Sequence, residues 1–406
     1  MYRMVIIPSV DRVLKRRNPS GRDRLPAGTV LIVSPGGLEH NGGIGRQMGY
    51  FLRAQSATPG KVHYQIVDPR GPWYIGDSPL YLGFAMLYLT GAVFSLIKAR
   101  ISSARCLAHI NIAGRGSTIR KIILVMVARA LRMRYLLHVH DPDYAGDYYS
   151  RGKFFKTLVA SAFRRAAAIV VLGKRDQAVI SQLFQMSNDR VIILYNAVPD
   201  PMLDVDTKHS VKPPHLLFLG RLSARKGVPE LLRALGSPSM TSLSWSATLA
   251  GDGPLGEFRQ LADDLGVRGR VCFPGWIDES GVGRLCADAD VLVLPSHGEG
   301  LAMSVLEGLA HGLAVVTTPV GAHCEVIEPE VSGIFVPPGD VPALASALAR
   351  VIDDESLRRR LGRGARERFL KEFDVRRYAC RLGRLHSDLL AYGVPKRGLI
   401  GKGQRF

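Results

Sequence analysis

Acidic residues and cysteines are both scarce in this chain of 406 residues. Its 35 Asp and Glu residues are outnumbered by 54 Lys and Arg residues, which gives a formal net charge of +19. Such a surplus favours an anionic partner, for example a phosphorylated substrate, an acidic lipid surface or nucleic acid. The five cysteines are scattered and form no CxxC pair. This argues against a disulfide framework or a zinc site and favours a reducing, cytoplasmic location.

Long hydrophobic runs are also rare. Residues 1–27 hold seven basic and two acidic side chains, and the apolar run Met4–Ile7 is too short for a signal peptide, so we expect a basic arm there. Leu80–Ile97 is the exception, because its 18 residues carry no charge and are long enough to cross a bilayer. Three alternatives stay open for it: a membrane span, a buried helix, or a helix lying on a membrane surface beside Lys98 and Arg100.

The chain is rich in short apolar runs that alternate with helical stretches, six in each half. Each run predicts a strand, and the alternation predicts two doubly wound parallel sheets, an α/β fold with two Rossmann-like domains. The expected strands are Thr29–Ser34, Val62–Val67, Leu107–Ile112, Tyr135–Val139, Ala168–Leu172, Val191–Leu194, His215–Leu219, Thr248–Ala250, Val271–Phe273, Val291–Leu294, Ala314–Thr317 and Ile334–Val336.

A change in composition divides the two halves. Pro and Asp residues accumulate in Asp200–Pro214, which predicts a linker. We therefore expect a basic arm at 1–27, a first domain at 28–200 and a second domain at 201–375. A C-terminal helix at 376–406, with a basic tail, is expected to return toward the first domain.

The most informative stretch is Val291–Gly321, which predicts a strand, a loop, a short helix and a second strand. Its loop follows the carboxyl end of a strand, where parallel sheets bind ligands. Glu299 on the loop and Glu307 on the helix are placed to hold two parts of one ligand, with helix N–H groups between them for an anion. An alternative for Glu307 is a capping box with Ser304, in which the carboxylate only satisfies a donor at the helix end.

Basic residues follow other expected strands. Arg221 and Lys226 stand between a strand end and a helix, which predicts a cradle for a diphosphate. Arg115, Arg120 and Lys121 crowd the start of another helix, where they oppose the helix dipole. This conflict predicts an anion site, although a solvated basic turn would give the same pattern.

Further turns stand at the same edge of the expected sheets. Gly42 and Gly43 lie in a loop where backbone N–H groups can approach a phosphate, although the loop lacks the GxGxxG spacing and an ordinary tight turn is the alternative. Gly251 and Ile277 stand at two more strand ends, and the His140–Asp141 pair follows the fourth strand. Together these loops predict a cleft between the two domains that holds a nucleotide diphosphate.

Three of these segments resemble the family 4 retaining glycosyltransferases of the GT-B fold. They are Gly220-Arg221 to Lys226-Gly227, the turn Gly251-Asp252-Gly253, and Glu299 to Glu307, which matches the E-x7-E element of that family. The resemblance covers roughly residues 29–392 and is stronger after residue 194. It implies two Rossmann-like domains facing across a cleft, and a transferase of the hexosyltransferase class (EC 2.4) that needs no metal and no cofactor.

The resemblance also implies roles for individual residues. The expected catalytic residues are Glu299, His140, Arg221 and Lys226. The expected donor site consists of Gly43, Arg221, Lys226, Gly251, Ile277, Gly300, Leu301, Ala302, Met303 and Glu307, with Glu307 on the ribose and the two cations on the diphosphate. The expected acceptor side consists of Gly42, Arg115, Arg120, Lys121, His140 and Asp141.

The segment Glu299–Met303 reads EGLAM, which is closer to the EGLPM of the exopolysaccharide branch than to the common EGFGL, although Ala302 departs from both. That branch uses polyprenyl-diphosphate-linked acceptors. The expected function is therefore retaining transfer of a hexose, from GDP-mannose or a UDP-hexose, to such an acceptor in bacterial exopolysaccharide synthesis. The expected location is peripheral, on the cytoplasmic face of the plasma membrane, without a nucleic-acid partner. The rival is a basic GT-B-fold protein that binds anionic lipid or nucleic acid without catalysis.

Overall fold

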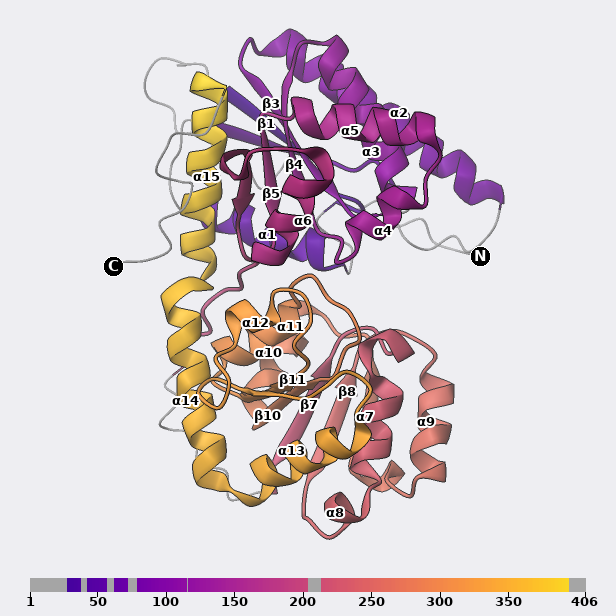
Figure 1. Ribbon diagram of the computed structural model, residues 1–406, viewed down its shortest axis with the longest axis vertical. Helices are drawn as coiled ribbons and strands as arrows, with labels where there is room; N and C mark the ends of the chain where they lie inside the picture. Colours follow the sequence, from indigo (N-terminus) through magenta and orange to yellow (C-terminus); the bar gives the residue numbers. More distant parts are fainter. Residues whose placement is uncertain are drawn as a thin grey trace, which may run out of the picture.

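The structure is a computed structural model that describes residues 28–37, 42–56, 62–71, 79–114, 116–203 and 213–393. The basic arm at 1–27, Arg115, residues 204–212 of the expected linker and the tail beyond residue 393 lie outside the described residues. The described residues form two α/β domains, one above the other in Figure 1, each built on a six-stranded parallel sheet. This confirms the expected fold class of two Rossmann-like domains.

The first domain has the strand order β2-β1-β3-β4-β5-β6. Its strands are β1 (Gly28–Val33), β2 (Val62–Val67), β3 (Cys106–Ile112), β4 (Arg134–Val139), β5 (Ala168–Val171) and β6 (Val191–Ile193). The central strands are apolar almost throughout because helices cover both faces of the sheet. The edge strand β2 is only half-buried.

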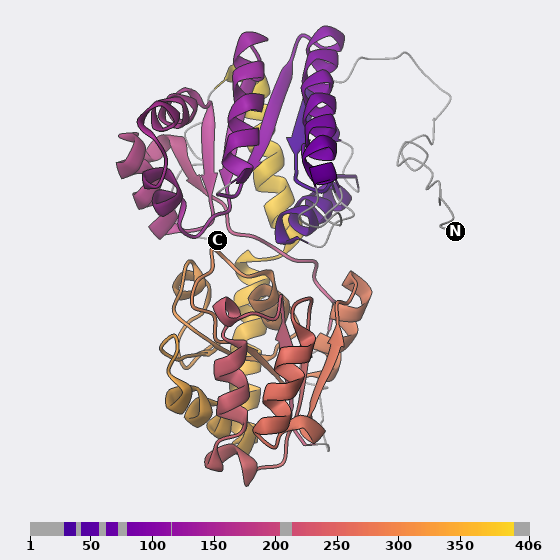
Figure 2. The same ribbon diagram turned by 90° about the vertical axis from the view of Figure 1, so that its right-hand side faces the viewer.

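Two groups of helices cover this sheet. One hydrophobic cluster joins one face to α1 (Gly43–Ser56) and α15 (Val375–Tyr392), and a second joins the other face to the remaining helices. Those helices are α2 (Pro79–Ser102), α3 (Gly116–Ala130), α4 (Tyr144–Tyr149), α5 (Lys153–Arg165) and α6 (Lys174–Phe184). Figures 1 and 2 show α15 on the opposite side of the sheet from α2 and α3.

The second domain has the strand order β12-β11-β10-β7-β8-β9. Its strands are β7 (His215–Leu219), β8 (Ser246–Ala250), β9 (Val271–Gly275), β10 (Val291–Leu294), β11 (Ala314–Thr317) and β12 (Ile334–Phe335). Its helices are α7 (Val228–Leu235), α8 (Pro238–Thr241), α9 (Leu255–Asp264), α10 (Glu279–Asp288), α11 (Met303–Ala310), α12 (His323–Val326), α13 (Val341–Asp353) and α14 (Glu355–Glu372).

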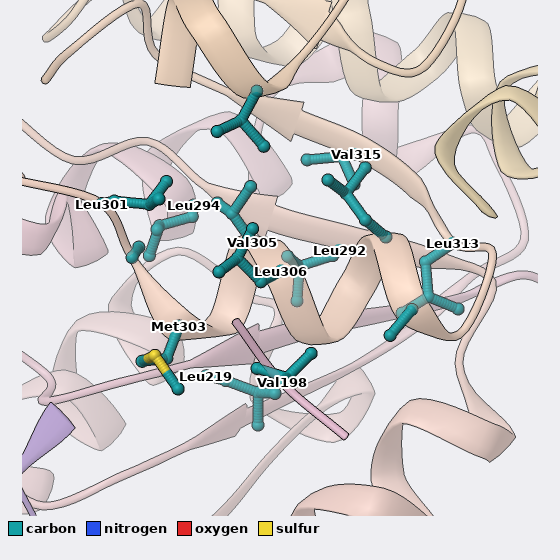
Figure 3. Close-up of a cluster of buried hydrophobic side chains, with 14 of the residues drawn as sticks. Val198, Leu219, Leu292, Leu294, Leu301, Met303, Val305, Leu306, Leu313 and Val315 are labelled. Atoms are coloured by element: carbon teal, nitrogen blue, oxygen red, sulfur yellow. The ribbon is translucent and has the colours of Figure 1, made fainter. Parts of the chain in front are cut away.

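Helix α11 is the buried centre of the second domain, because all eight of its residues are buried. Val305 and Leu306 lie in one hydrophobic cluster with Leu292 and Leu294 of β10 (Figure 3). A Cβ atom on Gly308 would lie 2.8 Å from the side chain of Leu292, so the helix and the strand approach very closely. This packing fixes α11, and with it Glu307, relative to the sheet.

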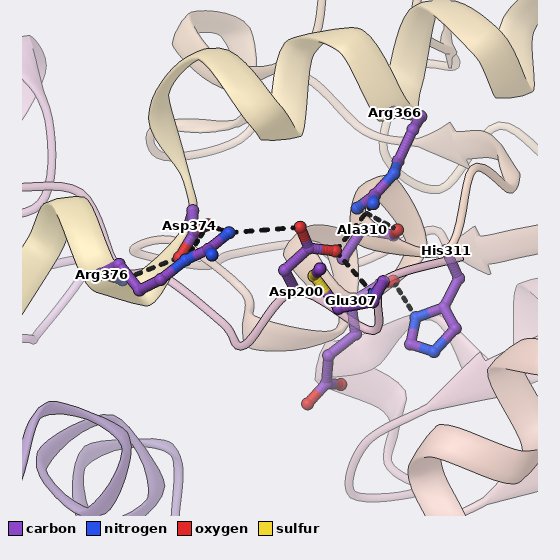
Figure 4. Close-up of polar contacts among 8 residues, drawn as sticks. Asp200, Glu307, Ala310, His311, Arg366, Asp374 and Arg376 are labelled. Carbon is purple, nitrogen blue, oxygen red and sulfur yellow. Dashed lines mark hydrogen bonds and ion pairs between the residues drawn. The ribbon is translucent and has the colours of Figure 1, made fainter. Parts of the chain in front are cut away.

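The chain crosses between the domains twice, and the two crossings are bonded together. The backbone N–H of Val198 donates to the carbonyl of Phe373, 3.1 Å away, where the chain leaves α14 for α15. Asp200 accepts from Arg366 of α14 at 2.7 Å and from Arg376 of α15 at 3.3 Å (Figure 4). The C-terminal helix α15 thereby packs against α1 of the first domain.

All twelve expected strands are present within two residues of their expected limits. The long apolar run Leu80–Ile97 lies within α2, which packs on the sheet through buried Leu89 and Leu96 and exposes Leu87 and Phe94. The alternative in which Leu80–Ile97 is a buried helix is therefore wrong. Among the described residues, Gly83–Ser102 is the helix long and apolar enough to cross a membrane, and 28% of its most apolar window is buried.

Candidate active site between the two domains

The two carboxylates of the central stretch are both buried where the domains meet. Glu299 lies on the loop after β10 and is 8% exposed, and Glu307 lies on α11 and is 4% exposed. Buried carboxylates need partners, because burial without hydrogen bonds or opposite charge is strongly unfavourable. Each of the two has a basic partner.

Lys226 is the partner of Glu299, with its Nζ 2.5 Å from Glu299 Oε1. Lys226 ends the 3₁₀ turn Ala224–Lys226, and the next residue, Gly227, has a φ of +72°. A Cβ atom there would lie 2.1 Å from the carbonyl oxygen of Pro295, so a glycine is required for this loop to contact the end of β10. The loop after β7 and the loop after β10 therefore form one unit.

Arg46 of the first domain is the partner of Glu307, with Nη1 3.1 Å from Oε1. Burial raises the pKa of Glu307, and the Arg46 guanidinium offsets part of that rise. Both carboxylate oxygens are buried, and neither accepts a hydrogen bond from the described residues. Figure 4 shows the carboxylate pointing away from the cluster of Asp200, Arg366 and Arg376.

The alternative for Glu307, a capping box with Ser304, is wrong. Helix α11 begins at Met303, with Ala302 as its N-cap and no side-chain cap. Ser304 is thus already the second helical residue, and Glu307 lies beyond the first turn. Its carboxylate has no role in capping and is directed toward the other domain.

Other expected site residues also meet across the domains. A Cβ atom on Gly300 would lie 3.4 Å from the carbonyl oxygen of His140, and one on Gly43 would lie 3.7 Å from Met303 Cγ. The amide of Asn196 donates to the carbonyl of Leu301 at 3.0 Å. The 299–303 segment, which also holds buried Ala302, thus faces both the glycine loop and the end of β4.

His140 is held by Asn111, which lies on the neighbouring strand β3. Asn111 Nδ2 donates to the carbonyl of Val33 at 3.1 Å, so its Oδ1 must be the atom 2.8 Å from His140 Nε2. Because that oxygen only accepts, His140 Nε2 carries the proton. Burial lowers the pKa of His140 to about 3, so the ring is neutral and its Nδ1 presents a lone pair.

A row of buried histidines continues from His140 into the domain. The rings of His138 and His140 lie 4.1 Å apart between centroids. His138 Nδ1 is 3.2 Å from His109 Nε2, and His109 Nδ1 is 3.0 Å from Nε2 of His386 on α15. Burial lowers the pKa of His109 and His138 well below the usual value and that of His386 to about 3, so this row is neutral.

The expected acceptor residues are placed differently from one another. Gly42 is exposed beside the first glycine loop, and Asp141 Oδ2 accepts from the backbone N–H of Gly114 at 2.6 Å. Lys121 is 1% exposed, its Nζ has no hydrogen-bond partner among the described residues, and burial lowers its pKa to about 7. Arg120 is half-buried on the same helix. Lys121 therefore does not lie on the open surface of the cleft.

The remaining expected donor residues lie at the strand ends of the second domain. Arg221 is exposed, and Ile277 is half-buried. Gly251 has a φ of +153°, and a Cβ atom there would lie 1.8 Å from the carbonyl oxygen of Gly220. The two strand-end loops therefore touch through backbone atoms beside Arg221. The described residues contain no group of three or more His, Cys, Asp or Glu side chains placed to hold one metal ion.

Several residues of the site were missed in the sequence. Arg46 follows the glycine loop directly. His323 is fully buried, and burial lowers its pKa, an effect that the nearby Glu299 carboxylate only partly offsets. Glu325 accepts from the Tyr195 hydroxyl at 2.8 Å across the domains. His138 on β4 and His140 directly after it are two residues apart, and this spacing in extended chain was a usable signal for a shared face.

Comparison with known proteins places this chain among glycosyltransferases. Residues 203–368 match the family described as "Glycosyl transferases group 1". The chain is 32% identical over 282 residues to the lipopolysaccharide core biosynthesis glycosyltransferase LpsD of Rhizobium meliloti, which covers 67% of this chain and 76% of that protein. It is 27% identical over 243 residues to an uncharacterized glycosyltransferase of Methanocaldococcus jannaschii. The aligned region covers 56% of this chain and 62% of that protein, which is less than two thirds of its length.

Solved structures share the whole architecture. Sucrose-phosphate synthase of Thermosynechococcus elongatus superposes with a TM-score of 0.69 at 22% identity, over 90% of this chain and 99% of that one. HepE of Anabaena, solved with UDP and glucose, gives a TM-score of 0.67 at 17% identity, over 89% of this chain and 100% of that one. Identities this low establish the fold alone, and that fold is GT-B.

Proposed function

The chain belongs to the family of group 1 glycosyl transferases, and on this basis we propose that it transfers a hexose from a nucleotide-diphosphate sugar to a glycan acceptor. The donor lies between the domains, with its nucleotide on the second domain. The acceptor enters from the first domain, on the side of His140 and Gly42. The anomeric configuration is retained, and neither a metal nor a cofactor takes part.

The observation that carries this proposal is the state of Glu307. Both of its carboxylate oxygens are buried, and within the described part of the chain neither has a hydrogen bond and Arg46 is the cation paired with them. A buried acceptor without donors is unfavourable by roughly 1–3 kcal/mol. The two neighbouring hydroxyls of a ribose are donors at the spacing of a carboxylate, so ribose binding satisfies both oxygens.

The leaving diphosphate is assigned to Lys226, Arg221 and the start of α11. Negative charge grows on the diphosphate as the glycosidic bond breaks, and cations fixed beside it stabilise the transition state. Lys226 is held in place by Glu299, at 2.5 Å. Because Lys226 neutralises Glu299, this carboxylate is a weak nucleophile and instead orients the sugar. The acceptor hydroxyl attacks from the face that the diphosphate leaves, and a diphosphate oxygen takes its proton.

The relatives support a UDP-hexose as the first donor to test, with GDP-mannose as the second. HepE, the fold relative described above, was solved with UDP and glucose. We propose a lipid-linked saccharide as the acceptor, in exopolysaccharide synthesis at the cytoplasmic face of the plasma membrane. The surplus of 19 positive charges favours such an anionic surface.

Thermal shift with nucleotide sugars tests the proposal. A ligand that binds only the native state adds about 2.7 kcal/mol of stability at a hundredfold excess over its Kd. We expect UDP-glucose or GDP-mannose to raise the Tm of the wild type and of the control Glu330→Gln, which alters an exposed ion pair, but not of Glu307→Gln. Activity with the stabilising donor should be unchanged by EDTA. Absence of any shift, or an equal shift in Glu307→Gln, would contradict the assignment. Binding without sugar transfer would instead favour a non-catalytic binding protein.

A further inference from the structure

Exposed large apolar side chains are concentrated on one side of the first domain. Eight of the fifteen found among the described residues lie on α2 and α3, and two more lie on α4 and α5. Phe94 on α2 is 67% exposed, and Met126 on α3 is 49% exposed. Isolated apolar residues on a surface are ordinary, but a contiguous group of them marks an interaction surface.

The spacing of these residues shows that they form continuous stripes. On α3, Ile119, Ile123 and Met126 follow one another by four and three residues, so they lie on one face. On α2, Leu87 and Phe94 are seven residues apart and also share a face, opposite the buried residues that pack on the sheet. Both helices belong to the layer that covers one face of the sheet, and Figure 2 views that layer from outside. We call this surface, formed by the exposed residues of α2 and α3, the α2–α3 face.

Positive charge predominates around this face. Helices α2, α3 and α5 together contain nine Lys and Arg residues and no Asp or Glu, although Lys121 is buried and Asp147 of the adjacent helix α4 contacts Thr118 of α3. Lys98 interrupts the outer stripe of α2, and Lys153 stands beside Phe154, which is 78% exposed at the start of α5. A second copy of the chain docked face to face would bring these positive charges together. An anionic lipid surface complements both the charge and the apolar stripes.

We propose that the α2–α3 face docks the protein on an anionic lipid bilayer, with the apolar stripes inserted at the interface and the surrounding Lys and Arg side chains on the headgroups. Helix α3 starts directly after the carboxyl end of β3, where Asn111 holds His140. Docking therefore brings the acceptor side of the cleft close to the membrane surface. This inference rests on the proposed function, because it assigns the membrane as the place from which the acceptor enters.

Co-sedimentation of the full chain with vesicles tests this docking. Vesicles of phosphatidylcholine with 30% phosphatidylglycerol should bind the wild type, and pure phosphatidylcholine should bind it at least tenfold more weakly. The variant Phe94→Ser/Ile123→Ser should bind the anionic vesicles more weakly than the wild type by a factor of about ten or more, because two inserted side chains are lost. The matched control Val331→Ser/Leu370→Ser removes two exposed apolar residues of the second domain and should bind like the wild type.

Equal binding of the two double variants would overturn the proposal, as would equal binding to both kinds of vesicle. A loss of dimer in the Phe94→Ser/Ile123→Ser variant, with unchanged vesicle binding, would also overturn it and assign the face to a second copy. The Tm shift with the nucleotide sugar separates this test from that of the proposed function. If only the docking proposal is wrong, the nucleotide sugar still raises the Tm, but vesicle binding does not depend on the α2–α3 face. If only the donor site is wrong, vesicle binding depends on the α2–α3 face, but the nucleotide sugar does not raise the Tm.

Discussion

Arg46 on α1 and Glu307 on α11 form an ion pair between the two domains, with Arg46 Nη1 3.1 Å from Glu307 Oε1. The carboxylate assigned to the nucleotide ribose is therefore coupled to the helix that begins at the first glycine loop. The Arg46 side chain is 30% exposed and that of Glu307 is 5% exposed. Such a pair contributes little as a whole, but removal of one partner leaves the other buried and unpaired.

Arg46→Ala should lower the free energy of unfolding by about 2 kcal/mol or more, because Glu307 then lacks its positive partner. In urea denaturation, the double variant Arg46→Ala/Glu307→Gln should recover part of this loss, since the neutral amide needs no cation. Arg350→Ala, which breaks an ion pair with about half of each side chain exposed, serves as the control and should change stability by less than about 1 kcal/mol. An equal loss of free energy of unfolding in Arg46→Ala and Arg350→Ala would show that the buried interdomain pair matters no more for stability than an exposed one.

Lys226→Ala and Arg221→Ala should each reduce kcat by about 10²–10³-fold, because each removes a fixed positive charge from the leaving diphosphate. Arg233→Ala, an exposed arginine on α7, should leave kcat unchanged. Steady-state rates with the donor found by thermal shift provide the measurement, and far-UV circular dichroism confirms the fold of each variant. Normal turnover of Lys226→Ala would remove it from the mechanism.

Asn111→Asp should give the reaction a new dependence on pH. In the wild type the neutral ring of His140 presents the Nδ1 lone pair, and its pKa of about 3 keeps this form at all working pH values. A carboxylate at position 111 favours the imidazolium, raises the pKa of His140 and turns Nδ1 into a donor. We expect kcat/KM of this variant to rise with pH across the neutral range while the wild-type profile stays flat there. A uniform loss of activity without a change in the pH profile would indicate a purely structural role.

Acid should destabilise the protein through its buried histidines. The pKa values of His109, His138, His140 and His386 are all lowered by burial, whereas each is near 6.5 in the unfolded chain. Below that pH the unfolded chain binds more protons than the folded chain. Each histidine therefore lowers the free energy of unfolding by about 1.4 kcal/mol for every unit by which the pH decreases. The stabilisation is complete above about pH 7 and is lost as the pH falls.

Urea denaturation between pH 7.5 and 5 measures this slope. His386→Phe removes one of the four groups and should reduce the slope by about 1.4 kcal/mol per pH unit. His63→Gln, at an exposed position of β2, should leave the slope as it is. A slope that does not respond to His386→Phe would mean that the row of histidines is protonated in the folded state.

The strands and the second-domain loops were predictable because their determinants are local. Runs such as Val291–Leu294 are apolar throughout and end at Pro or Gly, so both their type and their limits follow from the sequence. Parallel strands have their carboxyl ends at one edge of the sheet. This rule predicts that Lys226 and Glu299, which follow two such strands, lie close together, as they do. Gly227 also indicates this proximity, because a side chain at position 227 would prevent the loop after β7 from contacting Pro295 at the end of β10.

The interdomain contacts were not predictable in this way. The pattern within one domain does not indicate which side chain crosses to the other, so Arg46 was not assigned to Glu307. His109 and His386 are 277 residues apart, and only the return of α15 to the first domain brings them into contact. The capping box failed for a local reason: Ala302 takes the N-cap, which moves Ser304 into the helix where its hydroxyl cannot cap it.

The bond between Val198 and Phe373 ties the two crossings of the chain at one place beside Asp200. Domains joined in this way can rotate about that place but cannot slide past each other, since sliding would stretch both crossings at once. We therefore expect rotation of the two domains to follow one arc. On that arc the path of the chain sets how Gly300 approaches the carbonyl of His140, and with it how donor and acceptor are aligned.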